Sequence, residues 1–149
     1  KLEMIDIASQ NSDMTMWLDS GYRLGIWQRD FSRYQKRKIN PNKFLLATRK
    51  VMAGNDFAFS HLVKKIKFFH KIDMEKYNPK GPCLQGNLFL SKSSKIAWLK
   101  ERFKYHWNQL IENNDYGTDE QPLTMSYWDT PDSPTYSYPE WLKILSLTK

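Results

Sequence analysis

The sequence predicts a mainly α-helical single domain, with about five helices around an aromatic-rich core. Its 149 residues are a usual length for one domain, and eight Phe, eight Tyr and six Trp supply bulky apolar surface. Apolar side chains also recur at helical spacing in several segments. No internal repeat divides the chain, so residues 1–149 are expected to form one domain. The first residue is Lys and not Met, which leaves open that the chain is an excerpt of a longer protein.

Three of the predicted helices lie in the first half of the chain. The first begins with capping side chains at 11–13 and continues to Phe31, although two glycines inside it weaken the pattern. The second spans 41–53, because a proline opens it and Gly54 follows its end. The third spans about 56–71, where apolar residues recur at i, i+3, i+4 and i+7.

The second half of the chain contains the clearest helical pattern. After a connection over 73–87, residues 88–90 form a short apolar run that is a candidate strand. Serines at 93–94 then cap a helix whose apolar side chains recur at steps of three and four: Ile96, Leu99, Phe103, Trp107 and Leu110. Residues 114–138 are predicted to form a loop-like acidic and aromatic arm within the domain. A last short helix is expected from Pro139.

The net charge of +7 is distributed unevenly along the chain. Residues 29–80 carry fourteen basic and four acidic side chains, a net +10, and residues 81–104 add a net +4. Residues 1–28 carry a net −2 and residues 105–149 a net −5. The cationic middle of the chain therefore indicates an acidic partner, such as nucleic acid or an acidic protein.

The basic side chains of this middle region predict a nucleic-acid-binding module. Lys and Arg neutralise phosphates and release counterions, which gives affinity for DNA or RNA without reading the base sequence. The alternative is that they are solvated outer faces of helices, since their clustering in space is an assumption. Tyr34 and Tyr77 are candidates for stacking on exposed bases. The predicted backbone contacts are Arg33, Lys36, Arg37, Lys38, Lys43, Arg49, Lys50, Lys64, Lys65 and Lys67.

The aromatic and acidic segment 126–141 supports a second interpretation, a protein-interaction or adaptor domain. Its aromatic side chains are suited to act as hot spots, with the basic face of the domain meeting an acidic partner. The alternative is a loop that covers the core of its own domain. The predicted partner-binding residues are Tyr127, Trp128, Tyr138 and Trp141.

Catalytic and metal-binding motifs are weak, so a non-enzymatic function is expected, with no catalytic residue, cofactor or metal. His61 and His70 are nine residues apart, not the four that would place both rings on one metal. An enzyme remains the third interpretation, with His106, Arg102 and Glu101 as its candidates. The chain offers no glycine-rich phosphate loop and no nucleophile elbow.

Cysteine usage and hydropathy predict an intracellular protein with no membrane partner. Cys83 is the only cysteine, and the chain contains no N-glycosylation sequon. No apolar run reaches the roughly 18 residues that a membrane span needs. The first ten residues lack the layout of a signal peptide.

Overall fold

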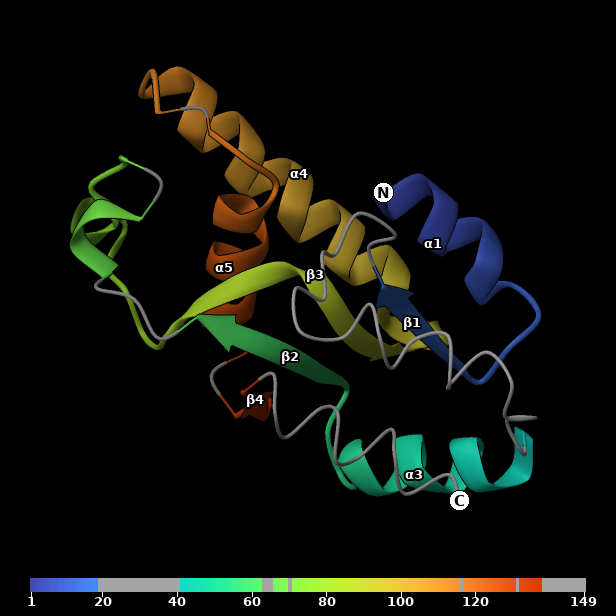
Figure 1. The fold of residues 1–149 in the computed structure, drawn as a ribbon. Coiled ribbons are helices and arrows are strands. Elements are labelled where there is room, and N and C mark those ends of the chain that lie inside the picture. Colours follow the sequence, from blue (N-terminus) through green and yellow to red (C-terminus); the bar gives the residue numbers. More distant parts are fainter. Residues whose placement is uncertain (19–40, 63–65, 70, 116, 131, 138–149) are drawn as a thin grey trace, which may run out of the picture.

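The computed structural model describes residues 1–149 except for 19–40, 63–65, 70, 116, 131 and 138–149. The described residues form an α/β fold, with helices on a four-stranded mixed sheet (Figure 1). The predicted mainly α-helical class is therefore wrong. In chain order the elements are α1 (Leu2–Ser9), β1 (Met14–Leu18), α3 (Pro41–Val51), β2 (Phe57–Leu62), β3 (Cys83–Lys92), α4 (Ile96–Glu112), α5 (Glu120–Trp128) and β4 (Thr135–Tyr136).

Strand β3 is the centre of the sheet, whose strand order is β1-β3-β2-β4. It pairs antiparallel with β1 and with β2, and Phe89 lies opposite both Trp17 and Phe59. A shift of register between Phe59 and His61 marks an irregularity in β2. Strand β4 pairs parallel with β2 at the other edge of the described sheet.

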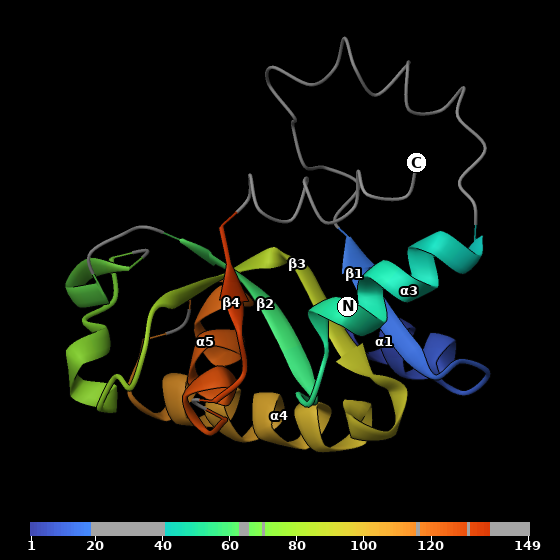
Figure 2. The same ribbon diagram turned by 90° about the horizontal axis from the view of Figure 1, so that it is seen from below.

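The two faces of the sheet carry separate hydrophobic clusters. Side chains alternate along β2, so Phe57 and Phe59 join the larger cluster with residues of α1, α4 and α5, whereas Ala58 joins the smaller one. The smaller cluster includes Val51 at the end of α3. Figure 2 shows α4 and α3 on opposite sides of the strands. The sheet is therefore covered on both faces.

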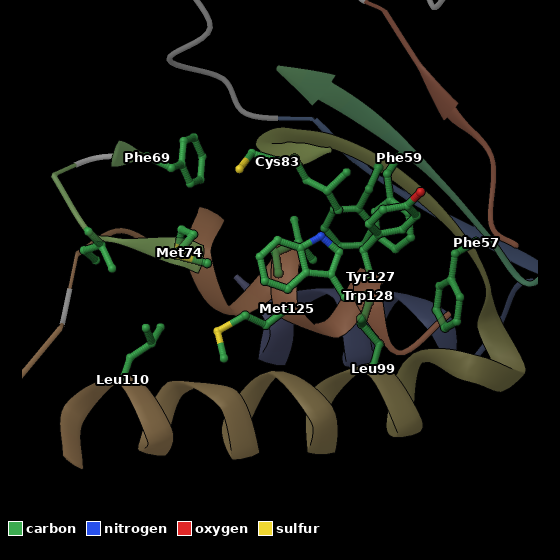
Figure 3. Close-up of a cluster of buried hydrophobic side chains, with 14 of the residues drawn as sticks. Phe57, Phe59, Phe69, Met74, Cys83, Leu99, Leu110, Met125, Tyr127 and Trp128 are labelled. Carbon is green, nitrogen blue, oxygen red and sulfur yellow. The ribbon is translucent and has the colours of Figure 1, made fainter. Parts of the chain in front are cut away.

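Aromatic packing fills the larger cluster between the sheet and α5 (Figure 3). The ring of Phe59 lies 5.5 Å from that of Tyr127 in an edge-on arrangement, and Phe57 lies 5.4 Å from Trp98 of α4. The Trp128 indole donates a hydrogen bond of 3.2 Å to the Gly81 carbonyl. The expected aromatic-rich core is thus present, although a sheet forms one side of it.

Helix α5 lies inside the predicted loop-like arm at 114–138. Every residue from Gln121 to Trp128 is buried, and some of them are polar. The sequence of α5 therefore shows no apolar periodicity that would predict a helix. The Thr124 hydroxyl accepts a 2.9 Å hydrogen bond from the backbone N–H of Leu84. The Ser126 hydroxyl donates a 2.7 Å hydrogen bond to the carbonyl of Pro122, one turn earlier in the helix. These bonds satisfy the buried hydroxyls, so α5 packs on all sides without an apolar stripe.

Two of the predicted helices contain strands in their described residues. The predicted helix at 56–71 contains β2 and a short 3-10 turn at Ile66–Phe68, because apolar residues on one strand face and in the following turn imitate helical spacing. The predicted helix from 11–13 to Phe31 contains β1, and its part from residue 19 onward lies outside the described residues. The run at 88–90 belongs to a strand of ten residues, β3, which also takes in the end of the connection predicted at 73–87.

The helices predicted at 41–53 and after 93–94 are confirmed as α3 and α4. Gly54 follows α3 with φ at 79°, a left-handed conformation that glycine adopts without steric cost. Helix α1 was not predicted, and the helix expected from Pro139 lies outside the described residues. Among the described residues, no helix has both the length and the apolar composition needed to cross a bilayer.

A pair of matched leucine substitutions tests the packing of the core. Leu99 of α4 is 0 % exposed, whereas Leu46 of α3 is 64 % exposed. Leu99→Ala should lower the free energy of unfolding by about 2–5 kcal/mol through lost burial and the cavity left behind. Leu46→Ala should change it by less than about 0.5 kcal/mol. Urea denaturation measures both values, and equal losses would contradict this description of the core.

Candidate functional site

Helix α4 presents a polar stripe beside its apolar one. Arg102, Tyr105, His106 and Gln109 stand at i, i+3, i+4 and i+7, a spacing that places them on one face of a helix. The apolar side chains of α4 face the core from another side, with Leu110 fully buried. The two stripes thus position polar groups at the border of the core.

His106 is held by both of its ring nitrogens. Its Nε2 lies 2.7 Å from Oδ2 of Asp129, the residue that follows α5, and its Nδ1 lies 2.9 Å from Oε1 of Gln109. The Gln109 amide nitrogen donates in turn to the Tyr105 hydroxyl, at 3.1 Å. His106 is only 7 % exposed, so these contacts fix the plane of the ring.

Arg102 approaches the same carboxylate from one turn earlier. Its Nε donates a 2.8 Å hydrogen bond to Asp129 Oδ2, and its guanidinium lies over the Tyr105 ring at 4.6 Å. The two terminal nitrogens of Arg102 have no hydrogen-bond acceptor in the part of the chain that the structure describes. This leaves a planar pair of donors for an anion.

Asp129 has a lowered pKa. Its burial raises the pKa, but the hydrogen bonds and positive charges of Arg102 and His106 outweigh that effect. The carboxylate is therefore ionised at neutral pH and joins α4 to the end of α5.

A second wall comes from residues 76–80, in and after the 3-10 turn Met74–Tyr77. The Tyr77 hydroxyl donates a 2.7 Å hydrogen bond to Asp115, which also pairs with Lys76. The hydrogen bond from Lys76 is the main cause of a lowered pKa at Asp115, and the hydrogen bond from Tyr77 adds to it. The pKa of Tyr77 is raised, first by burial and then by the Asp115 carboxylate. Asp115 lies just beyond the end of α4, so it anchors this wall to the helix.

The two walls enclose a recess of about 370 Å³, within the size range of small-molecule sites. Met125 and Trp128 of α5 form its apolar part, and Figure 3 shows both between α4 and the sheet. Three cationic side chains and one carboxylate contribute to the lining. The lining residues are Lys76, Tyr77, Asn78, Lys80, Arg102, Tyr105, His106, Gln109, Met125, Trp128 and Asp129.

Of the basic residues predicted to bind nucleic acid, the four that the structure describes do not line this recess. Lys43, Arg49 and Lys50 are exposed on α3, and Arg49 lies 3.4 Å from Asp13. Lys67 is exposed in the turn at Ile66–Phe68, at the other end of the molecule from α3 (Figures 1 and 2). The remaining six predicted residues lie outside the described residues: Arg33, Lys36, Arg37, Lys38, Lys64 and Lys65.

The residues predicted to bind a partner protein fall in two places. Tyr127 and Trp128 are 5 % and 3 % exposed, so they are part of the core, in line with the alternative that this segment covers its own domain. Tyr138 and Trp141 lie outside the described residues. A partner contact by these aromatic residues stays a prediction.

The remaining chemical groups take little part in the recess. Glu101 is exposed on α4 and does not line it. Cys83 is 1 % exposed, and its pKa is raised to about 11 by burial and by the charge of Glu120. The described residues hold no cluster of three or more His, Cys, Asp and Glu side chains that suits a metal ion.

Removal of the Asp129 charge should weaken the fold in a pH-dependent way. A lowered pKa means that ionised Asp129 stabilises the folded state above the ordinary carboxyl pKa of 3.8, and that this contribution is lost as the pH falls through the lower folded value. Asp129→Asn should therefore cost about 0.5–1 kcal/mol of unfolding free energy at pH 7, because Asp129 is an exposed residue and solvent screens the charges of this carboxylate and its partners. The difference from the natural chain should shrink in acid. Urea denaturation across pH measures it, with exposed Asp132→Asn as the control.

Comparisons with known proteins add no assignment for this site. No family model, no curated protein and no solved structure matches the chain. The fold and the geometry of the recess are therefore the basis for the function proposed below.

Proposed function

We propose that the protein binds nucleic acid, with the recess between α4 and residues 76–80 as its main contact. The observation that carries this proposal is the convergence of cationic and aromatic side chains from two distant segments on one cavity. Lys76 and Arg102 are paired with Asp115 and Asp129, so Lys80 supplies the net positive charge that attracts an anion to the recess. A polyanion with flat rings is the ligand class that matches this combination.

The phosphate contacts come from Arg102 and Lys80. Arg102 uses its Nε on Asp129, which orients the free edge of its guanidinium, and a planar guanidinium binds phosphate oxygens in pairs. Lys80 is exposed at the rim and has no acidic partner among the described residues. Asp129 balances the charge of Arg102 and also contacts His106, so Lys80 is the one of these two cations without a carboxylate partner among the described residues.

The aromatic contacts come from Tyr77 and Tyr105. Tyr105 is 50 % exposed, and its ring already carries the Arg102 guanidinium on one side. Tyr77 is half-buried on the opposite wall. Stacking of a base on an aromatic ring contributes roughly 1–3 kcal/mol and tolerates any base, which supports binding without sequence preference. The exposed cations of α3 are the candidates for further contacts along the strand.

Binding of fluorescein-labelled single strands tests the proposal by fluorescence polarisation. Lys80→Ala should weaken binding about tenfold at low salt. It should also reduce the slope of log affinity against log salt by about 0.7, because one phosphate contact is lost. Lys80 makes no ion pair with the described residues, so its loss should leave the fold intact.

The matched control is Lys104→Ala, which removes an exposed cation from α4 away from the recess. Equal effects of the two substitutions would show that net charge, and not the recess, determines affinity. Absence of binding by the intact chain at low salt would exclude nucleic acid. An acidic protein partner would then be the function to pursue.

A further inference from the structure

We propose that the recess also cleaves RNA, with His106 as the general base that activates a 2′-hydroxyl group of the bound strand. This inference rests on the proposed function, because it requires the strand to lie in the recess. It goes further in assigning a reaction and in separating RNA from DNA. The enzyme interpretation of the sequence named His106 and Arg102, and the structure adds Asp129 and Gln109 to them.

The surroundings of His106 suit a ring that gains and loses a proton. Asp129 accepts from Nε2 in both protonation states. When the ring is protonated, Nδ1 donates to the Gln109 carbonyl oxygen, whose amide nitrogen donates to the Tyr105 hydroxyl. When the ring is neutral, the Gln109 side-chain amide can rotate by 180°. Its NH₂ then donates to His106 Nδ1, and its oxygen accepts from the Tyr105 hydroxyl. One set of contacts therefore serves both states.

Nδ1 is the nitrogen assigned to the ligand, because its partner Gln109 is neutral and can be displaced, whereas the ionised Asp129 on Nε2 is also held by Arg102. Gln109 lines the recess and is only half-buried, so a hydroxyl group of a ligand can take the place of its amide. Asp129, which follows the last residue of α5, contacts the other ring nitrogen, Nε2. The hydrogen bond from Arg102 fixes the position of the Asp129 carboxylate. A base oriented by a carboxylate on its far nitrogen is the arrangement that general-base catalysis on hydroxyl groups uses.

The nucleophile is taken from the ligand. Among the described residues, the lining of the recess includes no serine, threonine or cysteine. RNA carries a hydroxyl group next to each phosphodiester, whereas DNA has none at that position. The cations of Arg102 and Lys80 are placed to offset the negative charge that grows on the phosphate oxygens during attack.

The reaction balances without a co-reactant. His106 Nδ1 takes the proton of the 2′-hydroxyl group, whose oxygen forms a bond to phosphorus as the bond from phosphorus to the 5′ oxygen breaks. The departing oxygen takes a proton from water, and the hydroxide formed takes the proton from His106. The products are a 2′,3′-cyclic phosphate end and a 5′-hydroxyl end.

The first experiment compares three labelled strands of one sequence: RNA, its 2′-O-methyl form and DNA. Each is incubated with the intact chain and a chelator, then resolved on a denaturing gel and by mass spectrometry. Only the RNA should be cut, and its products should carry cyclic phosphate and 5′-hydroxyl ends. RNA that is bound but left whole, or fragments with 5′-phosphate ends, would overturn the inference. Absence of binding to all three strands would instead overturn the proposed function.

The second experiment uses His106→Gln, with Lys104→Ala as a control on the same helix. Loss of a general base should slow RNA cleavage about 10²–10⁴-fold. Affinity for the DNA strand should stay within about threefold of the natural chain, which also shows that the variant is folded. Equal cleavage by the natural chain and His106→Gln would overturn the role of His106.

Discussion

Strand β3 is the element on which the other parts of the structure depend. It pairs with β1 on one side and β2 on the other, so it satisfies backbone groups of both neighbours. It also contacts α5 directly, because the Leu84 amide donates to Thr124. Side chains that alternate along this strand supply both hydrophobic clusters, with Phe89 in the larger and Leu88 and Leu90 in the smaller. One strand of ten residues therefore links the sheet to the helices on both faces.

The packing of the helices on β3 determines the geometry of the recess. Because α5 is fixed on β3 and α4 packs on α5, Asp129 stands at one place relative to Arg102 and His106. The other wall is held by a separate carboxylate, Asp115, through Tyr77. Two carboxylates thus organise the recess, and Lys80, which pairs with neither of them, leaves it with a net positive charge. Such an arrangement orients donors before a ligand arrives, which lowers the entropy lost on binding.

The sequence predicted those elements whose apolar spacing matches their structure, namely α3 and α4. It failed for α5, because Gln121, Thr124 and Ser126 are polar and yet buried. The hydroxyls of Thr124 and Ser126 bond to Leu84 and to the helix itself, and the Gln121 side-chain oxygen accepts from Thr118. Of the candidate site, the Arg102–His106 spacing was visible in the sequence. The polar stripe that continues to Gln109 was the signal that sequence reasoning missed. The contribution of Asp129, which is 23 residues from His106, depends on how α5 packs and no local pattern reveals it.

The burial of Cys83 has a consequence for chemical labelling. The thiolate is the reactive form of cysteine, and a pKa near 11 leaves very little of it at neutral pH. The chain has no other cysteine, so the folded protein presents no reactive thiol to alkylating or oxidising agents. A single cysteine introduced at the rim of the recess would then be the only site modified. A fluorophore or spin label attached there would report on that wall alone.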